Sequence, residues 1–289
     1  MAEITAAAVR ELREISGQGM MDCKAALQQT GGDIQKALDL LRKKGMAVME
    51  KRGGRETKEG RIVGKVSPDG KRAVVTMLAS ETDFVAKSPD FQRAAELVAE
   101  ALMGAAAIPA SSEELAGLAA GGKKVADAVN EVVSKTGEKI HLGSFARFDL
   151  AGSGLLFCYV HFNGKIGTLL QIETDSEAVA KNPAVRTLAS DLAMHVTAVN
   201  PVSVSRTEVP ADQIEREREV ANAQVQNKPP QMVAKIVEGK LNKWFQSIVL
   251  LEQPFVKDDS KTVQQVIDET AKAAGGKITF KRFARLQIG

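Results

Sequence analysis

The strongest constraint on the fold of this chain is an internal repeat. Gly70-Lys71 recurs as Gly164-Lys165, at an offset of 94 residues (70 to 164). At the same offset, Val85-Ala86-Lys87 recurs without a gap as Val179-Ala180-Lys181. Self-similarity at a fixed spacing indicates that one supersecondary unit is used twice. We therefore expect a core made of two copies of one unit, called here the first copy and the second copy.

The sequence pattern of each copy predicts two strands that form a hairpin and are followed by a helix. In the first copy, residues 73–78 form an apolar run that is typical of a buried strand. Turn signals precede the second strand of each hairpin, at residues 67–70 and at Asn163-Gly164. Each helix opens with an N-cap residue and a proline, Ser88-Pro89 and Asn182-Pro183. The predicted fold class is therefore α+β with antiparallel sheets.

The last strand recurs at a larger offset, which indicates an insertion. Residues 145–148 (Phe-Ala-Arg-Phe) correspond to residues 283–286 (Phe-Ala-Arg-Leu), 138 residues later (145 to 283). The second copy is longer by the difference between 138 and 94, and this excess falls between Val199 and Val263.

The inserted segment, expected at 200–246, has the pattern of a helical hairpin. Residues 212–226 are charged and weakly amphipathic, residues 228–230 (Lys-Pro-Pro) stop the helix, and residues 232–245 carry apolar positions at helical spacing. Two antiparallel helices that project from a core bury little surface on their own. Such an arm typically meets a partner or another subunit, so self-association through it is one expected use.

The first 45 residues predict a three-helix bundle. A second helix is expected at 20–29, and Asp33 caps a third helix that ends before Gly45. A bundle this short is marginally stable alone, which is typical of a docking module. Residues 46–59 lack apolar periodicity, and we expect them to form a solvated basic linker.

Composition places the chain among soluble globular proteins. Hydrophobic residues make up 44% of its 289 residues, and no apolar run approaches the ~20 residues that span a bilayer. A net charge of +3 is too small to imply nucleic acid binding without a basic patch. Cys23 and Cys158 lie far apart and outside any CxxC pattern, which favours a reducing compartment. We expect a cytoplasmic protein without membrane contact.

No pattern of an enzyme active site or of a cofactor site is present. Residues 117–123 match the first part of a phosphate-binding loop, but Lys124 stands where a Ser or Thr would hold magnesium. His141, His161 and His195 are scattered, which favours core or surface histidines over a metal site or a catalytic base. We expect no enzymatic activity, cofactor, metal or direct nucleotide binding.

The strand-to-helix connection of the first copy carries an aromatic residue that its counterpart lacks. In the alignment of the two copies Asp83 corresponds to Glu177, so an acidic residue is kept, whereas Phe84 corresponds to Ala178. Connections of this kind often carry binding residues. Two interpretations stay open for each position: Asp83 caps the turn or serves a function, and Phe84 fills the core or binds a partner. The alanine counterpart favours binding for Phe84.

Three stretches give the chain a resemblance to a known family. They are residues 19–27 (Gly-Met-Met-Asp-Cys-Lys-Ala-Ala-Leu), 82–87 (Thr-Asp-Phe-Val-Ala-Lys) and 253–256 (Gln-Pro-Phe-Val). Together they resemble bacterial elongation factor Ts, the guanine-nucleotide exchange factor of elongation factor Tu, over essentially the whole chain. The resemblance implies a ubiquitin-associated-like bundle, a two-subdomain α+β core and a coiled-coil hairpin. The expected domains are 1–55 (bundle and linker), 56–150 (first copy), 151–199 with 247–289 (second copy) and 200–246 (hairpin).

The resemblance also implies a function and contact residues. The chain would bind elongation factor Tu with GDP and promote GDP release by disturbing the magnesium and phosphate site, stabilising the nucleotide-free state until GTP binds. The segment implied to act there is Thr82, Asp83, Phe84 and Val85. The bundle residues implied to dock on the GTPase are Leu12, Met20 and Met21. The core residues implied to touch it are Gly137 and His161.

An RNA-binding or assembly protein that uses the basic linker and the hairpin is the alternative function. Basic residues between positions 43 and 58 could contact RNA phosphates, although a solvated linker is the preferred interpretation and RNA contact is not expected. Met20 and Met21 are adjacent and cannot both point into one small core, so at least one is expected at the surface.

Overall fold

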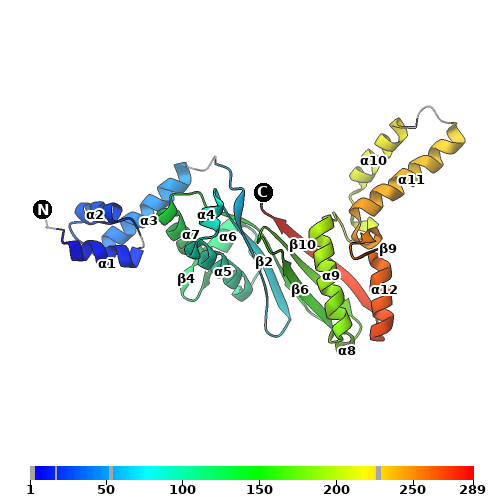
Figure 1. Ribbon diagram of the computed structural model, residues 1–289, viewed down its shortest axis with the longest axis horizontal. Helices are drawn as coiled ribbons and strands as arrows, with labels where there is room; N and C mark the ends of the chain where they lie inside the picture. The colour runs from blue at the N-terminus through cyan, green and yellow to red at the C-terminus, as the bar shows by residue number, and fades with distance from the viewer. Residues whose placement is uncertain (1–3, 17, 52–54, 226–228) are drawn as a thin grey trace.

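The computed structural model of the protein describes residues 4–16, 18–51, 55–225 and 229–289. Figure 1 shows an elongated molecule with the N-terminal helices at one end, strands flanked by helices in the middle, and two projecting helices at the other end. The fold is α+β, and its sheets pair antiparallel as predicted. Among the described residues, no helix has both the length and the apolar character that a bilayer crossing requires.

The N-terminal helices form a bundle with a small apolar core. They are α1 (Ala6–Ser16), α2 (Met20–Gln29) and α3 (Ile34–Lys51). Leu12 and Leu27 lie at the centre of the bundle. The prediction that the third helix ends before Gly45 and gives way to a linker is wrong, because α3 continues to Lys51. A glycine inside a helix costs only about 1 kcal/mol relative to alanine, and packing of α3 against α7 (Val125–Thr136) offsets that cost.

The two copies of the core have the same topology. The first sheet has the strand order β1-β2-β5, and the second has the equivalent order β6-β7-β10. The first copy consists of β1 (Glu59–Val66), β2 (Arg72–Ser80), α4 (Asp83–Ala86), α5 (Pro89–Gly104), α6 (Ser112–Gly117), β3 (Ala119–Ala120), β4 (Lys123–Lys124), α7 and β5 (His141–Asp149). The corresponding elements of the second copy are β6 (Gly154–Val160), β7 (Ile166–Thr174), α8 (Glu177–Ala180), α9 (Pro183–Val199), α12 (Val263–Ala274) and β10 (Ile278–Gln287).

The sheets pack face to face, and helices cover their outer faces (Figure 1). In β2, Val74 and Leu78 pack with the helices α5 and α7, whereas Ala73 and Val75 pack against the second sheet. Successive side chains of a strand point to opposite faces, so a strand buried on both sides reads as the continuous apolar run seen in the sequence.

Gly64 and Cys158 mark the place where the copies meet. They are equivalent positions of the repeat (64 and 158), and a side chain added at Gly64 would lie 2.1 Å from the Cys158 sulfur. Equivalent residues meet close to a rotation axis, and each hairpin turn reaches the other copy, Lys71 to Glu177 and Gly164 to Ile62. A pseudo-twofold axis therefore passes between β1 and β6. The glycine permits this approach. Cys158 is partly buried between the sheets, and loss of solvent around its thiol raises the pKa to about 12.

The insertion forms an arm with a core of its own. It consists of η1 (Arg206–Glu208), α10 (Ala211–Ala223) and α11 (Pro230–Ile248), and the chain returns through η2 (Leu250–Glu252), β8 (Pro254–Phe255) and β9 (Asp258–Thr262). The expectation that the arm buries little on its own is wrong. Its helices and their bases enclose a cluster that includes Val209, Val237, Leu241, Phe245 and Val249.

A buried histidine fastens the base of the arm to α9. The Nδ1 atom of His195 accepts a hydrogen bond from the Val256 N–H group (3.2 Å), and its Nε2 atom lies 3.0 Å from the Gln253 amide oxygen. Gln253 in turn donates to the Ser247 carbonyl at the end of α11 (2.8 Å). His195 is thus a satisfied core histidine, as expected, and residues 253–256 fix the insertion to the second copy.

Candidate functional site

The candidate site is α4, a one-turn helix that presents an aromatic side chain on a fixed backbone. Thr82 is its N-cap, because Thr82 Oγ1 accepts a hydrogen bond from the Val85 N–H group (3.4 Å). Ala86 is buried beneath the turn, and Val85 is half-buried. Phe84 points away from the core and is 83% exposed. The interpretation of Phe84 as core filler is therefore wrong.

Carboxylates hold this turn to the core from the side of β5. Glu138, which follows α7, accepts hydrogen bonds from the Thr82 N–H group (3.1 Å) and the Thr82 hydroxyl (2.6 Å). Glu81 accepts one from the Lys139 N–H group (2.7 Å) and one from the Arg55 guanidinium (2.8 Å). Hydrogen bonds to a charged acceptor are roughly twice as strong as neutral ones. The backbone under Phe84 is therefore fixed.

The second copy repeats this turn without the aromatic. Ser176 caps α8 by accepting a hydrogen bond from the Val179 N–H group (3.3 Å). The C-cap backbones also agree, with φ −85° and ψ −10° at Lys87 and φ −85° and ψ −5° at Lys181. Ala178 occupies the position of Phe84. The shared architecture therefore sets the backbone, and the phenyl ring is an addition to it.

Asp83 forms an ion pair with Lys87 one turn later in the chain. Its Oδ2 atom lies 2.7 Å from the Lys87 Nζ atom. The hydrogen bond from Lys87 lowers the pKa of the Asp83 carboxyl, and the same contact raises the pKa of Lys87. Thr82, not Asp83, supplies the cap of α4. Asp83 thus keeps an ionised carboxylate at the surface beside Phe84.

The two core residues implied by the resemblance lie in different copies. Gly137 ends α7 in the left-handed conformation (φ 67°), and its N–H group bonds the Val133 carbonyl (2.7 Å), which explains the glycine by the helix terminus alone. His161 lies in the turn between β6 and β7, and its Nδ1 atom is 3.0 Å from the Tyr159 hydroxyl. The contact roles of both stay predictions.

The three bundle residues implied by the resemblance separate into one buried and two exposed side chains. Met20 and Met21 begin α2 and are 52% and 75% exposed. Leu12 is fully buried in the bundle core (0% exposed). Leu12 packs in the same apolar cluster as Cys23 and Leu27 of α2, and its contact role stays a prediction.

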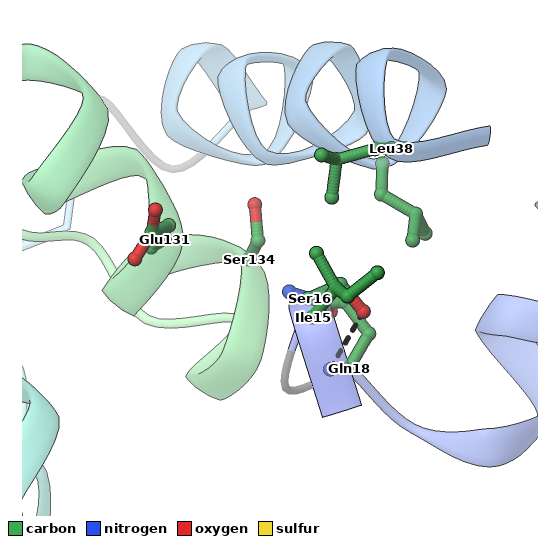
Figure 2. Close-up of a pocket in the computed structure, with 7 residues that line it drawn as sticks. Ile15, Ser16, Gln18, Leu38, Glu131 and Ser134 are labelled. Carbon is green, nitrogen blue, oxygen red and sulfur yellow. Dashed lines mark hydrogen bonds between the residues drawn. The ribbon is translucent and has the colours of Figure 1, made fainter. Parts of the chain in front are cut away.

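A cavity lies where the bundle meets the core. Its volume is about 250 Å³, and Figure 2 shows Leu38 of α3 facing Ile15 of α1 and Ser134 of α7 across it. With its amide group oriented to match its neighbours, Gln18 donates to the Ser134 carbonyl (2.7 Å) and accepts from the Lys135 N–H group (3.3 Å). The Ser134 hydroxyl is buried without a hydrogen-bond partner among the described residues. The bundle is therefore joined to α7 through an incompletely filled contact.

The site has the groups of a docking surface. Over the described ranges, no three His, Cys, Asp or Glu side chains lie together as metal ligands would. The exposed groups of α4 are an aromatic ring and a carboxylate. Such groups can enter or displace parts of a partner surface without any covalent step.

Sequence reasoning missed Glu138, although the repeat held a signal for it. At the offset of 138 residues that relates the last strands, Glu138 corresponds to Gly276. A side chain at Gly276 would lie 2.4 Å from a Val179 methyl carbon and 2.6 Å from the Asp175 carboxylate. The Glu138 clamp thus belongs to the first copy alone, as Phe84 does.

Comparison with known proteins gives a consistent answer. Residues 81–289 match the family described as Elongation factor TS. The chain is 41% identical to elongation factor Ts of Prosthecochloris aestuarii over 293 residues, with all of both chains covered. It is 41% identical to that of Symbiobacterium thermophilum over 291 residues (100% of this chain and 93% of the relative), and 42% identical to that of Chlorobium limicola over 296 residues, with all of both chains covered.

These similarities place the chain among the elongation factors of protein synthesis. It belongs to the elongation factor Ts family.

Proposed function

We propose that the protein is a guanine-nucleotide exchange factor for elongation factor Tu. It binds the GDP complex, promotes GDP release and stabilises the nucleotide-free state until GTP binds. The observation that supports this most is the exposed Phe84 on a turn fixed by Thr82 and Glu138, at a position where the second copy has Ala178. An aromatic side chain exposed at the end of a rigid support is suited to entering a pocket on a partner.

The mechanism needs binding energy and no covalent chemistry. GDP is held on a GTPase by backbone N–H groups around its phosphates and by magnesium. A factor that binds the nucleotide-free conformation more tightly weakens GDP binding by the same coupling free energy, because the linkage is reciprocal. In this proposal the Phe84 ring keeps the phosphate region open, and the Asp83 carboxylate disturbs the magnesium ligands beside it.

In this proposal the N-terminal bundle contributes affinity for elongation factor Tu. Met20 and Met21 present flexible, polarizable side chains that suit an adaptable contact, while Leu12 supports them from the core. The contact roles of Gly137 and His161 belong to the same proposal.

The alternative function, RNA binding through the basic linker, has less support. Lys44 pairs with Asp22 (2.5 Å), Arg55 pairs with Glu81 (2.8 Å) and Lys58 pairs with Glu56 (2.5 Å). Cations that are paired within the chain contribute less to phosphate binding, because each pair must first be broken.

Stopped-flow release of a fluorescent GDP from elongation factor Tu tests the proposal. We expect the full-length protein to accelerate release in a saturable way and excess GDP to reverse the effect. Unchanged release at high factor concentration would refute the exchange function. RNA affinity that falls steeply with salt, together with unchanged release, would favour the alternative.

A further inference from the structure

Two phenylalanines of the described residues are unusually exposed, and they come from different copies. Phe84 lies in α4 of the first copy, and Phe162, in the β6–β7 turn of the second copy, is 92% exposed. Single exposed apolar side chains are common, whereas exposed aromatic rings that lie near each other often mark a binding surface. Whether Phe162 belongs to such a surface therefore depends on where it lies relative to α4.

Direct contacts join the β6–β7 turn to the end of the sheet that supports α4. The Gly164 carbonyl accepts a hydrogen bond from the Ile62 N–H group of β1 (2.8 Å). The Lys165 Nζ atom lies 2.6 Å from the carboxylate of Glu59, the first residue of β1. Glu59 pairs with Ser80, the last residue of β2 before the chain enters α4. Phe162 and Phe84 therefore lie along the same edge of the molecule.

Two ion pairs lie along this edge. Lys165 contacts Glu59, and Lys87 contacts Asp83 beside Phe84. The hydrogen bond to Asp83 and, more weakly, the charge of Glu59 raise the pKa of Lys87. These four charged side chains are thus paired within the chain, and Phe84 and Phe162 are exposed apolar groups on the same edge.

The pseudo-twofold axis supplies an internal control for this edge. At the opposite edge, Lys71 of the β1–β2 turn contacts Glu177 of α8 (3.4 Å), the equivalent arrangement of a hairpin turn beside a one-turn helix. The counterparts of the two rings there are Pro68 and Ala178. Both aromatic additions to the repeat therefore fall on one edge, and the other edge has neither.

The Phe162 ring also has a defined support. Its centroid lies 4.3 Å from that of His161, and His161 Nδ1 lies 3.0 Å from the Tyr159 hydroxyl. The turn itself closes with hydrogen bonds from the His161 N–H group to Ile166 (2.9 Å) and from the Gly164 N–H group to His161 (2.8 Å). A ring held in this way loses little conformational entropy on binding.

We propose that Phe162 is a second aromatic anchor for the partner that Phe84 engages, inserting into an apolar pocket on the same GTPase. This inference rests on the proposed exchange function and adds a specific contact from the second copy. Because Phe162 is borne by a separate hairpin, it supplies affinity, whereas Phe84 acts on the nucleotide site. Truncation of Phe162 therefore raises the factor concentration needed for half-maximal exchange and leaves the saturated rate unchanged.

The test titrates the full-length protein and its variants against elongation factor Tu that carries fluorescent GDP. We expect Phe162→Ala to raise the half-saturating concentration about ten-fold, as loss of an aromatic anchor does, with an unchanged saturated rate and urea midpoint. Phe162→Trp should restore affinity. Pro68→Ala, at the equivalent turn on the opposite edge, is the matched control and should titrate as the unmodified protein.

Each outcome decides the proposal. If the unmodified protein accelerates release and Phe162→Ala titrates identically, Phe162 is no anchor and the exchange function stands. If the unmodified protein does not accelerate release, the exchange function and this inference fall together. If Phe162→Ala instead abolishes a dimer of the factor seen in sedimentation while exchange is unaltered, the ring binds a second copy and the inference is wrong.

Discussion

The turns α4 and α8 share their backbone and differ in what they present. Both are one-turn helices with a hydroxyl N-cap, Thr82 or Ser176, and the same C-cap conformation. The first copy adds an exposed phenylalanine and the Glu138 clamp, where the second has Ala178 and Gly276. The comparison separates what the fold requires from what is added to it. The common backbone is structural, and the additions lie on the edge proposed to bind the partner.

The largest effect is expected for Phe84→Ala, which makes the first turn resemble the second. We expect GDP release at saturating factor to fall about 100-fold, or about 2.7 kcal/mol. The free energy of unfolding, obtained from the urea midpoint, should change by no more than about 0.5 kcal/mol, because the ring is exposed. Ala178→Phe is the matched control and should create no second exchange site. A strongly destabilised Phe84→Ala protein that exchanges normally when folded would reverse this assignment.

His195→Ala tests a second asymmetry between the copies. The counterpart of His195 in α5 is Ala101, so alanine suits this helix position, yet the arm is fastened through the imidazole. Loss of the buried ring leaves the Val256 N–H group and the Gln253 amide oxygen without these partners. We expect a loss of about 2 kcal/mol in the free energy of unfolding, measured by urea denaturation. A change within experimental error would mean that the arm is held by its apolar cluster alone.

Glu138→Ala removes the clamp that the second copy lacks. The Thr82 N–H group and hydroxyl lose their acceptor, and we expect a loss of about 1 kcal/mol in the free energy of unfolding. GDP release should slow, but less than in Phe84→Ala, because the ring remains on a looser turn. Glu138→Gln keeps an acceptor and should retain most of the activity. Normal exchange by both variants would show that Thr82 needs no support.

The smallest expected effect is the pH dependence contributed by His195. Burial lowers the pKa of this imidazole below its ordinary value of 6.5. The unfolded chain therefore binds a proton more readily than the folded protein. The stabilisation that the neutral His195 ring provides is fully present above about pH 6.5 and declines as the pH falls towards the folded-state pKa. Urea midpoints of the unmodified protein and His195→Ala should converge between pH 7 and pH 5, and a constant difference would contradict the assignment.

The sequence predicts most of the core because its signals are local. Ser88-Pro89 and Asn182-Pro183 begin α5 and α9 where expected, with hydrogen bonds from Phe91 N–H to Ser88 Oγ (3.3 Å) and from Ala184 N–H to Asn182 Oδ1 (3.0 Å). Residues 105–122 are rich in small residues, and they contain α6 and the start of the β3–β4 hairpin. Short elements with few periodic positions give weak patterns.

The errors and omissions arise where distant segments meet. Gly45 does not end α3, because α3 gains contacts with α7 that no local propensity records. The Glu138–Thr82 contact joins two segments of the first copy that lie 56 residues apart, and the place of Phe162 on the same edge as α4 depends on how the copies pack. The arm's apolar residues were visible, but that they close into a core with Val209 and Val249 was not. Pattern gives the elements, and tertiary packing decides which of them become a site.

The face-to-face sheets have a consequence for synthesis of the chain. The inter-sheet core joins Ala73 and Val75 of the first copy with Leu286 and Ile288, which lie at and just beyond the end of the last strand. During translation the first copy leaves the ribosome with this apolar face uncovered, and its covering arrives with β6 and β7 and is completed only with β10. Exposed apolar sheet faces are prone to aggregation while a chain is incomplete. The duplicated architecture therefore leaves the nascent chain with an uncovered apolar sheet face until its second copy has been made.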